Sequence, residues 1–290
     1  MLSDPSEFEL QNQRGIALAK EGRLAEAEAV FLEAAKLWPE SHKPHSNLAL
    51  VYKSMGRPQK VAAALRAAVA RDRDNARLSA RLAQACLDAS EREGAVDAAL
   101  HAESLEPSRS HRLLAAHALL REARAEEALA RAHAVLAEGD TGAAALAIEI
   151  NCLLLLDREP EALIAIERTA SALPSATAIQ LAGAAVDLGR RAAATRLLGS
   201  IDRATLSAGD RNLVLLLNAE AMFGDGASAK AAEALSRIDP LPLSREGVLR
   251  LHAAWRALKD PGRAAAVAEA ALTRDPVSYT HLTLPTNREV

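Results

Sequence analysis

Small and apolar residues recur along this chain at the spacing of an amphipathic α-helix. After Ala27, the next large apolar side chain on the same helical face is Phe31, four residues later. The pattern is interrupted at Gly22, and glycine commonly ends a helix in a left-handed conformation. The spacing therefore predicts two antiparallel helices joined by a short turn, roughly from Glu7 to Lys20 and from Leu24 to Leu37.

The same helical hairpin recurs along the chain. The turn glycine, followed by arginine, is found again at Gly56, Gly189 and Gly262. Aligning the small or apolar residue near the start of the second helix gives eight reference residues: Ala27, Val61, Ala95, Ala128, Ala162, Ala194, Ala231 and Ala264. The steps between them are 34, 34, 33, 34, 32, 37 and 33 residues. A step this constant predicts about eight copies of one structural unit, and the longer step predicts an irregularity near residues 202–210.

Further columns follow from this register without adjustment. A column of mostly small residues stands twelve positions before each reference residue: Gly15, Ala49, Ala83, Ala116, Ile150, Ala182, Ala219 and His252. A bulkier column stands nine positions before it: Leu18, Tyr52, Cys86, Leu119, Leu153, Ala185, Met222 and Trp255. We expect the small column where paired helices approach most closely, and the bulky column between one pair and the next.

These columns resemble the tetratricopeptide repeat, whose helix pairs carry small residues, an aromatic residue and a closing proline at such positions. Repeat one matches at Gly15, Ala27, Phe31 and Pro39. The resemblance implies an all-α fold, a right-handed α-α superhelix of about eight helix-turn-helix repeats over residues 7–276. Stacked repeats of this kind are stabilised by contacts between neighbours.

Composition limits the classes of partner and the location that we expect for this chain. The chain carries 35 Lys and Arg residues against 38 Asp and Glu residues, a formal net charge of −3 at pH 7, which argues against a nucleic-acid partner. No apolar run reaches the length of a membrane span, so we expect no membrane partner. The N-terminus has no signal-peptide pattern, which predicts a cytoplasmic location. The abundance of Ala, Arg and Gly, favoured by GC-rich codons, suggests a bacterial source.

Residues typical of catalysis or metal binding are nearly absent from the pattern. His42 and His45 lack neighbouring ligands for a metal, and solvated histidines at a helix start are the simpler interpretation. Cys86 and Cys152 both fall in apolar helical patterns, where cysteine acts as a small core residue. We therefore predict no catalytic residues, no metal site and no cofactor.

The candidate function lies in the concave groove that the first helices of such repeats line. The resemblance places these polar residues there: Lys43, Asn47, Arg77, Arg81, Gln84, His117 and Asn151. In the chaperone-binding branch of the family, a carboxylate clamp uses Lys, Asn and Arg at comparable positions. Asn47, Arg77 and Arg81 match or approximate it, whereas Asn12 and Ile16 of repeat one do not. Long donors in one groove suit an acidic peptide, and the alternative is that they are ordinary solvated helix charges.

Later repeats present apolar residues at or beside the inner face: Ile148, Leu154, Leu155, Ile179, Val186, Leu213, Leu216, Leu217 and Phe223. An exposed stripe of this size would favour an amphipathic partner helix. The alternative is that part of the stripe packs between repeats and that a further C-terminal region shields the rest.

The last residues differ in composition from the rest of the chain. Residues 277–290 contain no alanine, and residues 277–286 resemble one reading frame of a transposon-derived sequencing adaptor, so we expect a non-native tail at 277–290. The alternative is an extended docking tail of native origin. Two functional classes follow. The chain is a non-catalytic protein-interaction scaffold, or it is the N-terminal recruiting arm of a larger transferase, such as a sulfotransferase or a glycosyltransferase.

Overall fold

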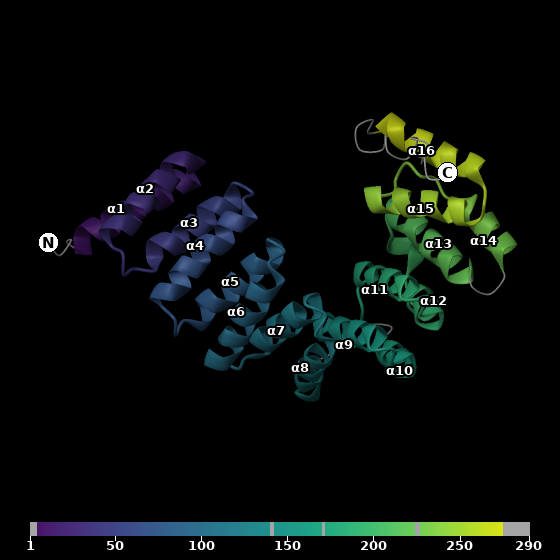
Figure 1. Cartoon of the computed structure of the whole chain (residues 1–290), viewed down its shortest axis with the longest axis horizontal. Helices are drawn as coiled ribbons and strands as arrows, with labels where there is room; N and C mark the ends of the chain where they lie inside the picture. Colours follow the sequence, from purple (N-terminus) through teal and green to yellow (C-terminus); the bar gives the residue numbers. More distant parts are fainter. Residues whose placement is uncertain (1–4, 140–141, 170–171, 224–226, 275–290) are drawn as a thin grey trace, which may run out of the picture. The chain divides into compact units, whose positions relative to one another are not determined.

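The computed structural model describes residues 5–139, 142–169, 172–223 and 227–274, and these residues contain sixteen α-helices (Figure 1). The helices fall into two compact units, Met1–Asp140 and Thr141–Val290. The predicted tail at 277–290 lies outside the described residues, so it stays a prediction, as does the single repeat region at 7–276.

Unit 1 contains four helical hairpins. Their helices are α1 (Pro5–Lys20), α2 (Leu24–Leu37), α3 (Lys43–Ser54), α4 (Pro58–Arg71), α5 (Ala76–Asp88), α6 (Arg92–Leu105), α7 (Arg109–Arg121) and α8 (Ala125–Ala137). Each helix packs on the next one in sequence, and the first helices α1 and α3, and α5 and α7, also contact each other. The predicted ends of the first hairpin agree with the structure to within two residues.

Unit 2 contains four further hairpins. Their helices are α9 (Ala143–Leu155), α10 (Glu159–Thr169), α11 (Ser175–Asp187), α12 (Arg191–Gly199), α13 (Ala208–Met222), α14 (Ser228–Leu235), α15 (Arg245–Ala257) and α16 (Pro261–Arg274). A 3-10 turn at Arg203–Thr205 stands between α12 and α13, at the place where the longer step predicts an irregularity. Within this unit the first helices α9, α11, α13 and α15 contact one another in order.

The repeat columns form the core of each unit. All the reference residues except Val61 are buried, and so is the small column, apart from the partly buried His252. Gly15 shows why this column is small: a Cβ atom there would lie 2.6 Å from Cε1 and Cζ of Phe31. The bulky column is buried except at Met222, which is 38% exposed, so the prediction of a core position is wrong for this residue.

In seven of the hairpins, the turn has one recurring backbone conformation; the turn between α13 and α14 includes residues outside the described ranges. Five residues before the reference position, φ is positive, between 58° and 77°, at Gly22, Gly56, Ser90, Ala123, Asp157, Gly189 and Lys259. The next N–H donates to the carbonyl oxygen of the bulky column, as from Arg23 to Leu18 at 3.0 Å, which closes the helix end. Gly262 is not such a turn residue, contrary to the sequence pattern, because it stands two residues before its reference and lies in α16.

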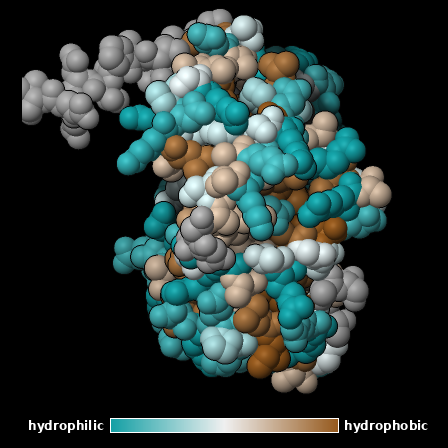
Figure 2. Space-filling model, turned by 90° about the vertical axis from the view of Figure 1, so that its right-hand side faces the viewer, coloured by the Kyte–Doolittle hydropathy of each residue, from teal (hydrophilic) through white to brown (hydrophobic). Residues whose placement is uncertain are grey.

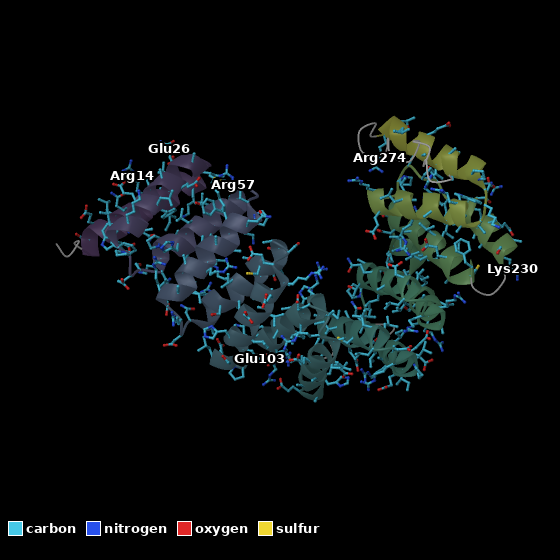
Figure 3. All side chains as sticks on the ribbon, viewed as in Figure 1. Arg14, Glu26, Arg57, Glu103, Lys230 and Arg274 are labelled. Atoms are coloured by element: carbon cyan, nitrogen blue, oxygen red, sulfur yellow. The ribbon has the colours of Figure 1, made fainter. Side chains whose placement is uncertain are left out.

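Four of the turns between repeats use side-chain caps instead, whereas α3, α9 and α11 begin without one. Asn75, Ser108, Ser207 and Ser244 accept hydrogen bonds from backbone N–H groups in the first turns of α5, α7, α13 and α15. Such caps satisfy donors that the start of a helix leaves unpaired. Charged side chains such as Arg14, Glu26 and Arg57 project outward from the helix pairs (Figure 3). None of the helices in the described ranges is long and apolar enough to cross a bilayer.

Candidate functional site

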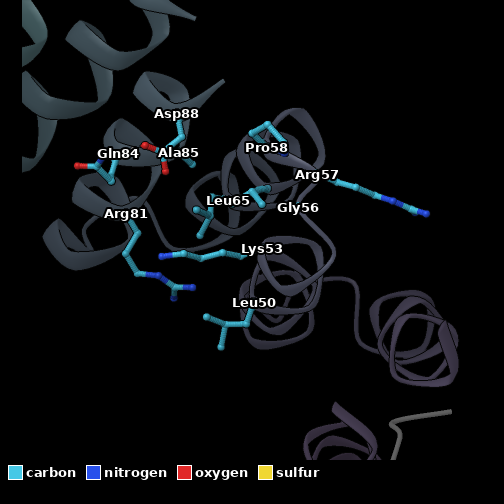
Figure 4. Close-up of a pocket in the computed structure, with 11 residues that line it drawn as sticks. Leu50, Lys53, Gly56, Arg57, Pro58, Leu65, Arg81, Gln84, Ala85 and Asp88 are labelled. Carbon is cyan, nitrogen blue, oxygen red and sulfur yellow. Dashed lines mark hydrogen bonds between the residues drawn. The ribbon is translucent and has the colours of Figure 1, made fainter. Parts of the chain in front are cut away.

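Two neighbouring pockets lie in unit 1, on either side of Leu50 of α3. The first, here called the Arg81 pocket, has a volume of about 240 Å³ and is lined by Leu50, Lys53, Gly56, Arg57, Pro58, Val61, Leu65, Arg81, Gln84, Ala85 and Asp88 (Figure 4). The second, the Phe31 pocket, measures about 250 Å³ and is lined by Ile16, Ala19, Lys20, Phe31, Asn47, Leu50, Val51 and Ser54. Leu50, 54% exposed, belongs to both. The two pockets are therefore adjacent and share the exposed side chain of Leu50.

Two cations converge in the Arg81 pocket. Lys53 and Arg81 point into the same space beside Leu50, whereas Arg57 points away from it (Figure 4). Within the part of the chain that the structure describes, neither Lys53 nor Arg81 forms an ion pair. The carboxylate of Asp88 accepts a hydrogen bond from Gln84 at 2.9 Å. The pocket therefore presents positive charge next to an exposed apolar side chain.

Arg81 is the more constrained of these two cations. Partial burial and the neighbouring charge of Arg77 lower its pKa, although a guanidinium stays charged at neutral pH. Its hydrogen bond goes to the carbonyl oxygen of Ser46, at 3.3 Å. By contrast, Arg131, a comparable side chain on a second helix, is paired with Glu103 at 2.8 Å. A half-buried guanidinium without a carboxylate is a favourable place for an anion.

The structure places the predicted groove residues in different settings. Arg81 and Gln84 line the Arg81 pocket, and Asn47 lines the Phe31 pocket. The Asn47 amide donates to Oδ1 of Asn12 at 2.6 Å, which joins α3 to α1.

The other predicted residues lie outside the two pockets. The ammonium of Lys43 stands 5.7 Å from the ring centroid of Phe8, and Arg77 is exposed beside the Arg81 pocket. His117 lies on α7 and Asn151 lies in unit 2, so the structure does not bring either residue to the pockets. Desolvation, followed by the charge of Arg121, lowers the pKa of His117.

Sequence reasoning missed the apolar part of this site. Leu50 and Ile16 line the pockets and stand eleven positions before their reference residues, as do Gln84, His117 and Asn151. The repeat register could have identified them, because it assigns all five residues to one position. Selecting only polar members of that column removed the two side chains that shape the site.

The apolar stripe expected in later repeats is mostly core. Ile148, Leu154, Ile179, Leu216 and Leu217 are buried, and of the nine residues only Leu155 is largely exposed, at 44%. For the five buried residues the expectation of an apolar groove is therefore wrong, and the alternative, that part of the stripe is packed inside the fold, is confirmed. Figure 2 shows one face of the molecule, where hydrophilic side chains predominate and hydrophobic patches lie between them.

The described residues offer little for covalent or metal chemistry. They contain no group of three or more His, Cys, Asp or Glu side chains placed to hold a metal ion. Cys86 and Cys152 are buried, and burial raises the pKa of the Cys86 thiol. A buried thiol with a raised pKa is a poor nucleophile.

No protein-family model matches the chain, and no curated protein matches it significantly. Solved structures do resemble it. A tetratricopeptide repeat protein from Parabacteroides merdae superposes with a TM-score of 0.60 at 12% identity, over 85% of this chain and 97% of that one. The MamA protein gives 0.51 at 15% identity, over 56% of this chain and 89% of that one. The chain therefore has an all-α helical-repeat fold of the tetratricopeptide type.

Proposed function

We propose that this chain is a non-catalytic protein-interaction scaffold that binds an acidic, extended peptide segment along the first helices of unit 1. The observation that carries the proposal is the convergence of Lys53 and Arg81, both without a carboxylate partner in the described chain, beside the exposed side chain of Leu50. Helical repeats commonly present extended surfaces of this kind to partners.

The two pockets suit different parts of one peptide. The Arg81 pocket offers charge-assisted hydrogen bonds to an Asp or Glu side chain. The Phe31 pocket offers Ile16, Leu50 and the edge of Phe31 to a small apolar side chain. A segment that alternates acidic and apolar residues would place one of each in the site.

Fluorescence polarisation tests the proposal. The probe is a labelled dodecapeptide of Asp, Glu and Leu, compared with a second dodecapeptide in which Asn and Gln replace Asp and Glu. We expect the acidic probe to bind and to weaken as salt increases, because exposed charges are screened. Arg81→Glu should weaken binding by tenfold or more, the scale of one charged hydrogen bond.

The matched control is Arg92→Glu. Arg92 is an exposed arginine of the same repeat and is the first residue of α6, where a negative charge is tolerated. This variant should keep the affinity of the original chain to within about twofold. Equal binding of the acidic and amide probes, or an equal effect of the two variants, would show that the groove charges are ordinary solvated charges.

A further inference from the structure

A second arginine on a first helix shows what such a side chain does when carboxylates are within reach. In unit 2, Nη2 of Arg250 on α15 lies 2.7 Å from Oε2 of Glu220 on α13. Its Nη1 lies 2.9 Å from Oδ1 of Asp187 on α11. The side chains of Arg250 and Glu220 are only 18% and 14% exposed. One guanidinium thus joins three successive first helices.

This network occupies the same repeat positions as the site in unit 1. The three positions stand fourteen, eleven and seven residues before the reference residues of three consecutive repeats. They are held by Arg250, Glu220 and Asp187 in repeats eight, seven and six, and by Arg81, Leu50 and Lys20 in repeats three, two and one. The arginine is retained, while the two carboxylates are replaced by an apolar residue and a cation.

In repeats two, three and eight, the side chain at the first of these positions donates a hydrogen bond to the preceding first helix. In repeat one, where α1 has no preceding first helix among the described residues, Gln13 donates to Glu9 of its own helix. Asn47 donates to Asn12 and Arg250 donates to Glu220. Arg81 donates to the backbone carbonyl of Ser46, since Leu50 offers it no acceptor. The direction of the side chain is therefore common to both units, and the acceptor is what differs.

We infer that Arg81 binds a carboxylate of the ligand in the way that Arg250 binds Glu220 of this chain. Leu50 stands at the repeat position of Glu220, so in unit 1 the position beside Arg81 is left for the ligand. The inference rests on the proposed function and specifies its ligand group, a carboxylate. The residue that stands eleven positions before the reference residue, Leu50 in unit 1 and Glu220 in unit 2, then determines whether the arginine can bind an acidic partner. A leucine leaves the arginine available, and a glutamate satisfies it from within the chain.

The replacement of Asp187 by Lys20 acts in the same direction. In unit 2, Asp187 adds a second carboxylate to Arg250, whereas in unit 1 Lys20 lines the Phe31 pocket as an additional cation. Lys53 and Arg81 line the Arg81 pocket, where the acidic lining residue is Asp88, whose carboxylate accepts a hydrogen bond from Gln84 and forms no described ion pair with Arg81. Partial burial of Arg81, reflected in its lowered pKa, increases the free energy gained from such a partner.

Substitution at Leu50 tests the inference in the full chain. Leu50→Glu supplies an internal carboxylate, and Leu50→Gln is its neutral isostere; both replace an exposed side chain. With the labelled Asp, Glu and Leu dodecapeptide as probe, we expect Leu50→Glu to bind at least tenfold more weakly than Leu50→Gln. Equal affinities of the two variants would overturn the inference and leave the proposed function standing.

A stability measurement separates failure of the inference from failure of the proposed function. If the original chain does not bind the acidic dodecapeptide, the proposed function fails. Urea unfolding of Leu50→Glu and Leu50→Gln, each with and without Arg81→Gln, then measures the coupling between position 50 and Arg81. A favourable coupling energy between Arg81 and glutamate at position 50, absent with glutamine, supports the inference that a carboxylate binds beside Arg81. The absence of such coupling overturns it.

Discussion

At the scale of single residues, Gly15 and Phe31 show most directly how a repeat column becomes packing. The ring of Phe31 lies where a side chain on Gly15 would be, so the two residues act as one packing unit. The small column predicts this contact from the sequence. The sequence does not predict which repeat has the tightest contact, because alanine fills the same column in most other repeats without a phenylalanine opposite it.

Gly15→Ala should therefore lower the free energy of unfolding by about 1–3 kcal/mol, the usual range for overpacking. Adding Phe31→Leu should recover part of this loss. The control is Gly183→Ala, since a Cβ atom there meets only Cδ2 of Leu217 at 3.9 Å, and alanine favours a helix. Urea unfolding followed by circular dichroism measures all three, and equal effects of the two glycine substitutions would contradict the packing argument.

The left-handed turn residues give a second prediction at this scale. Ala123 adopts a φ of 61° that alanine disfavours by about 1–2 kcal/mol. Ala123→Gly should stabilise the chain by up to about 1 kcal/mol, because the gain in the turn exceeds the entropy that glycine adds to the unfolded state. Gly56→Ala should destabilise it by a similar amount. The midpoints of urea unfolding should move in opposite directions for the two variants.

At the scale of elements, the register predicts the hairpins well and their pairings poorly. Alanine columns, the turn glycines at Gly22 and Gly56, and the longer step before α13 locate helices and turns because these features are local. Gly262 is wrongly predicted as a turn residue, because the local pair of glycine and arginine does not show how far the glycine stands from the reference residue. The pairing of Arg250 with Glu220 joins different repeats, and no local sequence pattern predicts it.

Helix α3 provides a pH-dependent prediction. Partial burial and then the charge of Arg71 lower the pKa of His45, and its Nε2 is buried without a hydrogen-bond partner in the described chain. Unfolded histidine binds a proton near pH 6.5. The folded state binds fewer protons just below that pH, so stability should fall as the pH falls from about 6.5.

His45→Gln should remove part of this loss. We expect the difference between the urea midpoints at pH 7.5 and pH 5.5 to shrink in this variant. His133→Gln, which replaces an exposed histidine on α8, is the control for loss of a histidine elsewhere. A pH dependence that is unchanged by His45→Gln would contradict the assignment.

At the scale of the whole molecule, the candidate site belongs to one unit. Both pockets are lined by residues of Met1–Asp140, which contains four complete hairpins. The repeat register places His117 and Asn151 in the same column as Gln84. Residues of one column occupy the same position in different repeats, and they need not lie close together in space. Of the seven predicted groove residues, Asn47, Arg81 and Gln84 therefore line the two pockets, and the binding role of all seven stays a prediction.

A fragment of residues 1–140 should therefore fold and bind the acidic dodecapeptide with the affinity of the full chain, to within about threefold. Its helical circular dichroism and cooperative urea unfolding would establish folding, and fluorescence polarisation would measure affinity. The complementary fragment of residues 141–290 is the control and should bind the probe more weakly, since Glu220 and Asp187 already occupy Arg250. Equal affinities of the two fragments would contradict this assignment.

The two helices of each hairpin pack on each other, and within each unit consecutive hairpins contact one another. A pulling force applied to the two ends of the chain would consequently load the hairpins in series. Release of one repeat of 34 residues adds roughly 120 Å of extended chain, at about 3.6 Å per residue. The molecule would lengthen in repeat-sized steps, so that a partner held by unit 1 could stay bound while other hairpins extend.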